Sequence, residues 1–151
     1  AAGLSRDGIA GAATWRAVRA GVLPPASSAP GRRVEVDLRR QLLVLVSAGQ
    51  VRQVFNTSTG TGRPYVVRGV TKRAVTPRGS FGVYRRVNGW DKGPLGSLYR
   101  PAYFHGGVAV HGYGSVPPYP ASHGCVRVSV QAMDWLWASD WLKLGRLVVV
   151  R

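Results

Sequence analysis

The residues able to do nucleophilic chemistry in this chain of 151 residues are concentrated between positions 108 and 129. That stretch holds the single cysteine, Cys125, and two of the three histidines, His111 and His123. A thiolate is a strong nucleophile, and cationic neighbours lower the pKa of a thiol. His123 and Arg127 lie two positions to either side of Cys125, so on an extended strand the three side chains would share one face. The spacing therefore predicts a nucleophilic cysteine flanked by positive charge.

Two histidines are available as the base for this thiol. Cα atoms two positions apart on a strand are separated by roughly 6.6 Å, which is long for a direct hydrogen bond between His123 and Cys125. His111 instead ends an apolar run, and the loop after it contains glycine and three prolines that stiffen the chain. We predict that this loop brings His111 beside Cys125 as the base. His123 has either a structural or a direct catalytic role, and His105 is interpreted as structural.

The backbone around the cysteine is expected to complete the site. Gly124 allows a close turn, and we expect an oxyanion hole from the backbone of Gly124, Cys125 and Gly112. The chain has six acidic residues, none of them between Asp91 and Asp134. A backbone carbonyl is therefore the expected partner that orients the histidine base. With one cysteine and a His-x-Cys spacing unusual for zinc, we expect no metal and no cofactor.

The pattern H-G-x9-S-H-G-C-x-R resembles the active-site signature of the YkuD family of L,D-transpeptidases. It is read here at His111, Gly112, Ser122, His123, Gly124, Cys125 and Arg127. The sequence T-P-R-G-S-F at 76–81 resembles a second motif of that family, and residues 34–38 resemble its opening strand. The resemblance covers residues 32–151.

This resemblance implies a cysteine-dependent L,D-transpeptidase acting on peptidoglycan stem peptides. The thiolate would attack the third residue of a tetrapeptide donor, expel D-alanine and leave a thioester, which an amine acceptor converts into a 3→3 cross-link. Arg127, Ser122 and Tyr113 are then expected to bind substrate. An L,D-carboxypeptidase, in which water resolves the same intermediate, and a non-catalytic module that binds the cell wall both remain open. The resemblance also implies export to the bacterial cell wall or the periplasmic or extracellular space.

The pattern of apolar residues predicts a mainly β domain. Apolar residues alternate with Glu35 and Asp37, which we expect to point outward, and the run 42–46 is typical of a strand buried on both faces. Further strands are predicted at 51–55, 81–87, 108–110 and 147–150, with a loop over 88–94. Ser129 is the expected N-cap of a helix that ends near Ser139. By resemblance, the fold consists of sandwich- or barrel-like sheets with this short helix after the cysteine strand.

The N-terminal part of the chain divides into two segments before the catalytic domain at 32–151. Residues 1–23 contain the pattern D-G-x-x-G-x-x-T-W and a short helical pattern, and they resemble the C-terminal remnant of a peptidoglycan-binding repeat. Residues 24–31 are rich in proline and serine, which is typical of a linker.

The net charge of +15 and a pI near 11.5 predict an anionic partner. The basic residues are dispersed and form no nucleic-acid-binding motif, so we expect no nucleic-acid partner. Anionic cell-wall polymers suit an arginine-rich surface, while solubility or genomic composition explains the same charge without a partner. No stretch reaches the roughly 20 apolar residues of a membrane helix. We expect a monomer without a transmembrane segment.

Overall fold

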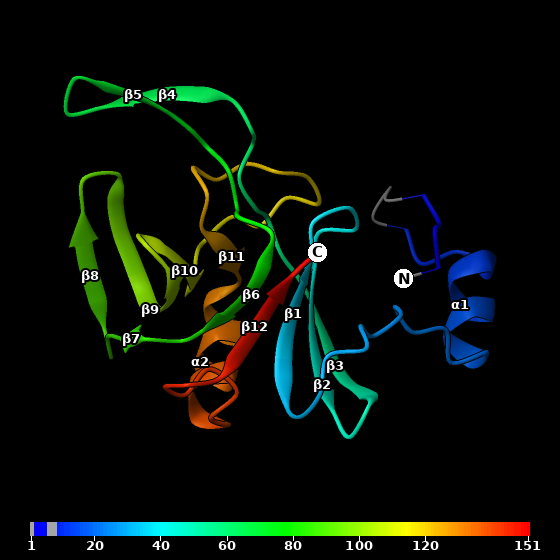
Figure 1. The fold of residues 1–151 in the computed structure, drawn as a ribbon. Coiled ribbons are helices and arrows are strands. Elements are labelled where there is room, and N and C mark those ends of the chain that lie inside the picture. Colours follow the sequence, from blue (N-terminus) through cyan, green and yellow to red (C-terminus); the bar gives the residue numbers. More distant parts are fainter. Residues whose placement is uncertain (1, 6–8) are drawn as a thin grey trace.

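The computed structural model describes residues 2–5 and 9–151 (Figure 1). The start of the repeat-like pattern, Asp7 and Gly8, lies outside the described residues. Within them there are two helices, α1 (Ala12–Arg19) and α2 (Val130–Ala138), and twelve strands. The strands are β1 (Arg33–Asp37), β2 (Leu42–Ser47), β3 (Gln50–Asn56), β4 (Pro64–Val67), β5 (Val70–Arg73), β6 (Gly79–Gly82), β7 (Arg85–Arg86), β8 (Trp90–Gly93), β9 (Gly96–His105), β10 (Val108–Gly112), β11 (Val126–Val128) and β12 (Leu147–Val150).

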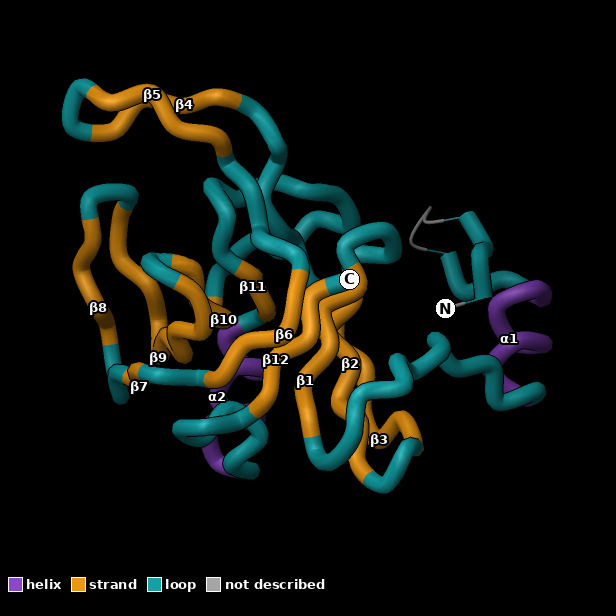
Figure 2. The backbone as a smooth tube through the Cα atoms, viewed as in Figure 1, coloured by secondary structure: helices purple, strands orange, loops and turns teal. Residues whose placement is uncertain are grey.

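The strands form two main sheets and one separate hairpin. The first sheet has the order β3-β2-β1-β12-β6, and the second has the order β11-β10-β9-β7 with β8 paired to β9. The pairs β1–β12 and β10–β11 are parallel, whereas the other pairs are antiparallel. The hairpin β4–β5 projects from the body of the molecule (Figure 2). The prediction of a mainly β fold with a short helix after the cysteine strand is confirmed.

The core lies between the two sheets and is closed by α2. Alternate residues of the strands point into it because side chains of a strand alternate between its faces. The fully buried members include Val34, Val36, Leu43, Leu45, Val110, Val126, Val128, Met133 and Leu136. As predicted, the side chain of Ser129 caps α2, accepting a hydrogen bond from the backbone N–H of Ala132 at 3.1 Å. The cap fixes the start of α2 one residue after β11.

The prediction that Glu35 and Asp37 point outward to solvent is wrong. Both are buried, because β1 lies in the middle of its sheet and the segment 24–31 covers its other face. The Glu35 carboxylate accepts hydrogen bonds from the Ser27 hydroxyl at 2.7 Å, from Arg33 Nε at 2.8 Å and from Arg151 Nε at 3.0 Å. Burial raises the pKa of Glu35, but these hydrogen bonds and the Arg151 charge outweigh it, so the pKa is lowered overall.

Residues 24–31 bind along the first sheet. Pro24 is buried, and Ala26 packs against the small apolar cluster of Leu42, Val44 and Val46. The segment thus has fixed contacts over much of its length. Helix α1 before it has no buried residue. The assignment of residues 1–23 to a repeat remnant stays a prediction. Neither helix in the described part of the chain has the length and apolar character to cross a membrane.

The structure divides the strand predicted over 81–87. Strand β6 pairs with β12 in the first sheet, whereas β7 pairs with β9 in the second. The chain crosses between the sheets at Val83, whose N–H bonds to the carbonyl of Arg146. The loop predicted over 88–94 contains β8, which forms a hairpin with β9. The alternation of apolar residues did not reveal β7 and β8 because both strands are short and largely exposed.

Candidate active site

The parallel pair β10–β11 brings the predicted base and nucleophile together. The register opposes Val110 to Val126 and His111 to Arg127, so each opposed pair shares a face of the sheet. Val110 and Val126 face the core and are fully buried. Cys125, directly before β11, therefore falls on the same face as His111. The register agrees with the expected approach of the two residues, and their roles as base and nucleophile stay predictions.

His111 is held in one orientation by the backbone. The side chain is 2 % exposed, and Nδ1 lies 3.0 Å from the carbonyl oxygen of Gly112. When Nδ1 donates to this carbonyl, Nε2 carries the lone pair and can accept a proton. A backbone carbonyl thus orients the His111 ring, as expected from the scarcity of acids, and the role of His111 as the base stays a prediction. Burial, helped by the Arg127 charge and opposed by the Gly112 contact, lowers the pKa of His111 to about 4. The ring is therefore neutral at neutral pH.

The thiol of Cys125 lies against the start of β10. Sγ is 3.7 Å from the carbonyl oxygen of Gly107, and the N–H of Ala109 favours the thiolate by hydrogen bonding. Burial raises the pKa of Cys125, and this effect outweighs the opposing influences of Ala109 and the Arg127 charge. The expected lowering of the pKa by cationic neighbours is therefore wrong in its net direction, because the sequence does not show how far the sulfur is withdrawn from water.

A tight turn, residues 122–125, presents the cysteine, and we refer to it as the catalytic turn. The Ser122 hydroxyl donates to the carbonyl of Cys125 at 2.6 Å and accepts the N–H of Gly124 at 3.0 Å. Thr76 Oγ1 donates to the carbonyl of Gly124 at 2.7 Å. Gly124 has φ +138°, and a Cβ there would lie 2.9 Å from the carbonyl oxygen of Val75. Only glycine fits this turn without displacing its neighbours.

His123 is not aligned with Cys125 on one strand. Strand β11 begins at Val126, and the positive φ of Gly124 bends the chain before it, so the predicted extended face from His123 to Arg127 does not form. His123 is exposed, and its ring meets the edge of Tyr65 on β4 at 4.8 Å between centroids. A direct catalytic role of His123 stays a prediction.

Arg127 and Tyr113 form one wall beside the base. The Arg127 guanidinium carbon lies 4.0 Å from the centre of the Tyr113 ring, which meets the His111 ring at 5.9 Å. Arg127 Nε is buried without a hydrogen-bond partner among the described residues. The Arg127 backbone exchanges hydrogen bonds with Ser58, which fixes the strand that carries the side chain. Substrate binding by Arg127, Ser122 and Tyr113 stays a prediction.

The backbone N–H of Cys125 is available as a hydrogen-bond donor, and its role in an oxyanion hole stays a prediction. This N–H has no hydrogen-bond partner in the described part of the chain, whereas the Gly124 N–H is bound to Ser122. Gly112 lies within β10, paired with Tyr99, and its carbonyl contacts the His111 ring. Within residues 2–5 and 9–151 no three metal-ligating side chains are grouped together.

Four contributors to the site were not identified by sequence reasoning. Thr76 lies within the T-P-R-G-S-F motif, which pointed to it without giving its role. Ala109 could have been found from the alternation along β10, since it lies two residues before the base. The Gly107 carbonyl contacts Cys125 Sγ, and the Tyr65 ring contacts His123. Both contacts join residues far apart in the sequence, so no local pattern predicts them.

Comparisons with known proteins identify the family of the chain. The family model of the YkuD L,D-transpeptidase catalytic domain matches residues 31–150. The crystal structure of an L,D-transpeptidase from Xylanimonas cellulosilytica is 48 % identical with a TM-score of 0.95, covering 100 % of this chain and 75 % of that one. A search of curated proteins found no match.

More distant structures share the fold. An L,D-transpeptidase from Stackebrandtia nassauensis is 22 % identical with a TM-score of 0.64, covering 83 % of this chain and 58 % of that chain. An L,D-transpeptidase in complex with imipenem, a carbapenem, is 18 % identical with a TM-score of 0.63, covering 80 % and 59 %. With the family model matching most of the chain around the Cys125–His111 pair, this protein belongs to the YkuD family of L,D-transpeptidase catalytic domains.

Proposed function

We propose that this chain forms 3→3 cross-links between peptidoglycan stem peptides through a thioester on Cys125. The family acts on peptidoglycan, which places its members at the cell wall. The observation that carries the proposal is the β10–β11 register, which opposes His111 to Arg127 and places Cys125 directly before β11, with Nδ1 of the His111 ring tied to the Gly112 carbonyl. With Nδ1 bound in this way, Nε2 is the nitrogen that can accept the thiol proton.

In the first half-reaction, Sγ of Cys125 bonds to the carbonyl carbon of the third stem residue. The thiol proton moves to Nε2 of His111, and the Cys125 N–H stabilises the oxyanion. Collapse of the tetrahedral intermediate breaks the bond to the terminal D-alanine, whose amine takes the proton from His111. The product of this half-reaction is a thioester and free D-alanine.

In the second half-reaction, the side-chain amine of another stem attacks the thioester carbon. His111 accepts a proton from this amine and returns a proton to the departing sulfur, which regenerates the thiol. We assign Ser122 a positioning role, because its hydroxyl is bound to the catalytic turn. Tyr113 is 39 % exposed beside the Arg127 guanidinium, and we infer that the two contact the substrate, with Arg127 attracting a carboxylate.

The reaction is tested by mass spectrometry of the products formed from a muropeptide with a tetrapeptide stem. A dimer that has lost one D-alanine is the expected product, and Cys125→Ala should form none. A tripeptide alone would mean that water resolves the thioester, which is the carboxypeptidase reaction. If neither product forms while the thiol is reduced and free, the wall-binding interpretation replaces the enzymatic one.

Carbapenems offer a second, independent readout of the same nucleophile. A relative has been solved in complex with imipenem. We propose that imipenem acylates this chain once, at Cys125, because a strained carbonyl suits a thiol beside a free amide donor. Intact mass should show one adduct on the native chain and none on Cys125→Ala.

A further inference from the structure

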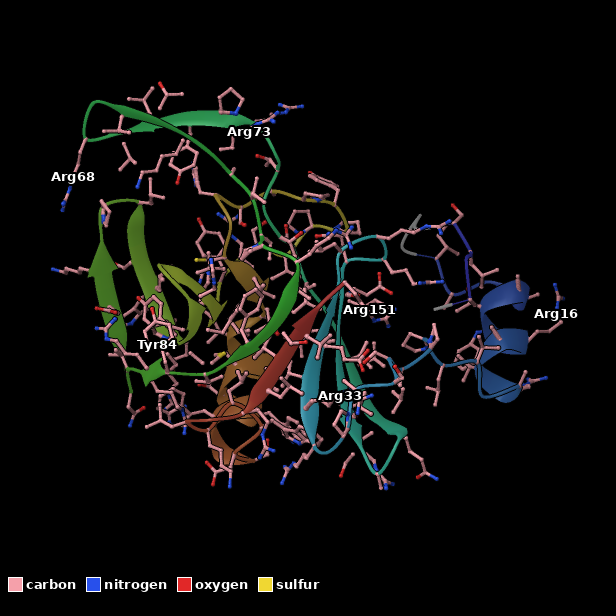
Figure 3. All side chains as sticks on the ribbon, in the orientation of Figure 1. Arg16, Arg33, Arg68, Arg73, Tyr84 and Arg151 are labelled. Carbon is pink, nitrogen blue, oxygen red and sulfur yellow. The ribbon has the colours of Figure 1, made fainter. Side chains whose placement is uncertain are left out.

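The hairpin β4–β5 and its flanks carry charge of one sign. Between residues 61 and 80 the chain has five cationic side chains and no acidic one. These are Arg63, Arg68, Lys72, Arg73 and Arg78. Arg68 lies in the turn at the tip, and Arg73 ends the returning strand (Figure 3). In the described part of the chain Arg68 and Lys72 have no ion-pair partner, so their charge is available to an external anion.

The same hairpin exposes apolar side chains close to its tip. Val66 is 68 % exposed and Val70 is 55 % exposed. The register pairs Val66 with Thr71 and Val67 with Val70, so the two exposed valines lie on opposite faces of the hairpin. Figure 2 shows the hairpin as an arm separate from both main sheets, with its tip above the β8–β9 turn. The two exposed valines give the tip an apolar side chain on each face.

We propose that the tip of the β4–β5 hairpin docks on an anionic lipid membrane. Valine side chains gain free energy when they leave water for the boundary between headgroups and acyl chains, and the surrounding cations are attracted to lipid phosphates. A soluble polyanion would satisfy Arg68 and Lys72 but would leave Val66 and Val70 in water. The combination of apolar tip and cationic sides therefore favours a lipid surface over a soluble polymer.

Docking in this way fixes the distance between the membrane and the catalytic turn. Tyr65, which contacts His123 in that turn, lies three residues before Arg68. At roughly 3.4 Å per residue, the tip extends about 10 Å beyond this contact. The nucleophile would face the layer of wall next to the lipid. The binding step itself does not depend on the proposed function, since it requires no turnover.

The test measures sedimentation of the full chain with vesicles of phosphatidylcholine containing phosphatidylglycerol, and with vesicles of phosphatidylcholine alone. Each surface cation contributes roughly fivefold to affinity for an anionic membrane, so Arg68→Gln with Lys72→Gln should weaken binding about 25-fold. The matched control is Arg39→Gln with Arg52→Gln, which removes two exposed cations from the first sheet and its turn. We expect this control to change binding by less than about threefold.

A second pair, Val66→Asn with Val70→Asn, keeps the charge and removes the apolar tip. We expect at least a fivefold loss of vesicle binding, with iodoacetamide labelling of Cys125 unchanged as a check on the fold. Undiminished vesicle binding by this valine pair would overturn the lipid proposal. Equal losses of vesicle binding in the hairpin cation pair and in the control arginine pair would also overturn it. The same holds if polyphosphate binds the chain as tightly as the vesicles do and the valine substitutions leave that affinity unchanged.

Discussion

The thiol of Cys125 should be neutral in the resting enzyme, which distinguishes this site from those with a preformed thiolate–imidazolium pair. Its pKa is raised above an ordinary value of 9.0, while that of His111 is lowered to about 4. Each pKa unit between the thiol and the ring adds about 1.36 kcal/mol to the cost of moving the proton from sulfur to the ring. Both shifts oppose this transfer, so the neutral thiol beside the neutral ring is the expected ground state.

Two measurements on the single cysteine read this state directly. Thiolate absorbance at 240 nm should show no titration step below about pH 8, because the thiol is still protonated there. The rate of alkylation by iodoacetamide should rise about tenfold per pH unit between about pH 6 and 8. In the proposed mechanism the proton therefore reaches His111 during attack on the substrate, when the forming oxyanion is stabilised.

Arg127→Gln sharpens the same test. The Arg127 charge lowers the pKa of both Cys125 and His111, so removing it should raise both pKa values. Alkylation at pH 8 should become slower than in the native chain, while His123→Ala serves as a control with little change. A rate plateau between about pH 5 and 8, or an absorbance step centred below pH 7, would refute the neutral-thiol reasoning.

Three further outcomes are expected. His111→Ala should lower turnover by roughly 10²–10⁴ in muropeptide assays, and His123→Ala far less; the reverse order would move the base to His123. Gly124→Ala should cost about 1–3 kcal/mol in urea unfolding and most of the turnover, and native-like values would contradict the tight turn. Glu35→Gln should cost about 3–5 kcal/mol because Arg33 loses its partner. In the native chain ionised Glu35 contributes to the free energy of unfolding above pH 4.5, and this contribution is lost as the pH falls through the lowered pKa of Glu35. A free energy of unfolding of the native chain that is the same at pH 3 as at neutral pH would contradict this prediction.

Much of the site could be predicted because its chemistry is local in sequence. Cys125 and its glycine are adjacent, and the apolar run before His111 placed that residue at the end of a strand. The scarcity of acids pointed to a carbonyl partner, which the structure supplies at Gly112. Periodicity also gave β2, α2 and β12, since each buries a continuous or regularly spaced apolar face.

The parts that could not be predicted depend on long-range packing. Glu35 alternates with valines as a solvent-facing residue does, yet Ser27 from the segment 24–31 and Arg151 after β12 bind its carboxylate. The net pKa of Cys125 depends on burial, which its cationic neighbour Arg127 does not reveal. The β4–β5 hairpin carries valines on both faces, so it has no single apolar face from which alternation could be recognised.

The side chain of Thr76 connects the base of the β4–β5 hairpin to the catalytic turn. Thr76 lies three residues after β5. Its hydroxyl donates to the Gly124 carbonyl at 2.7 Å and accepts the N–H of Gly60, which precedes β4, at 2.9 Å. A displacement of the hairpin tip is therefore transmitted to the Gly124–Cys125 peptide through Thr76, unless β4 and β5 bend and absorb it.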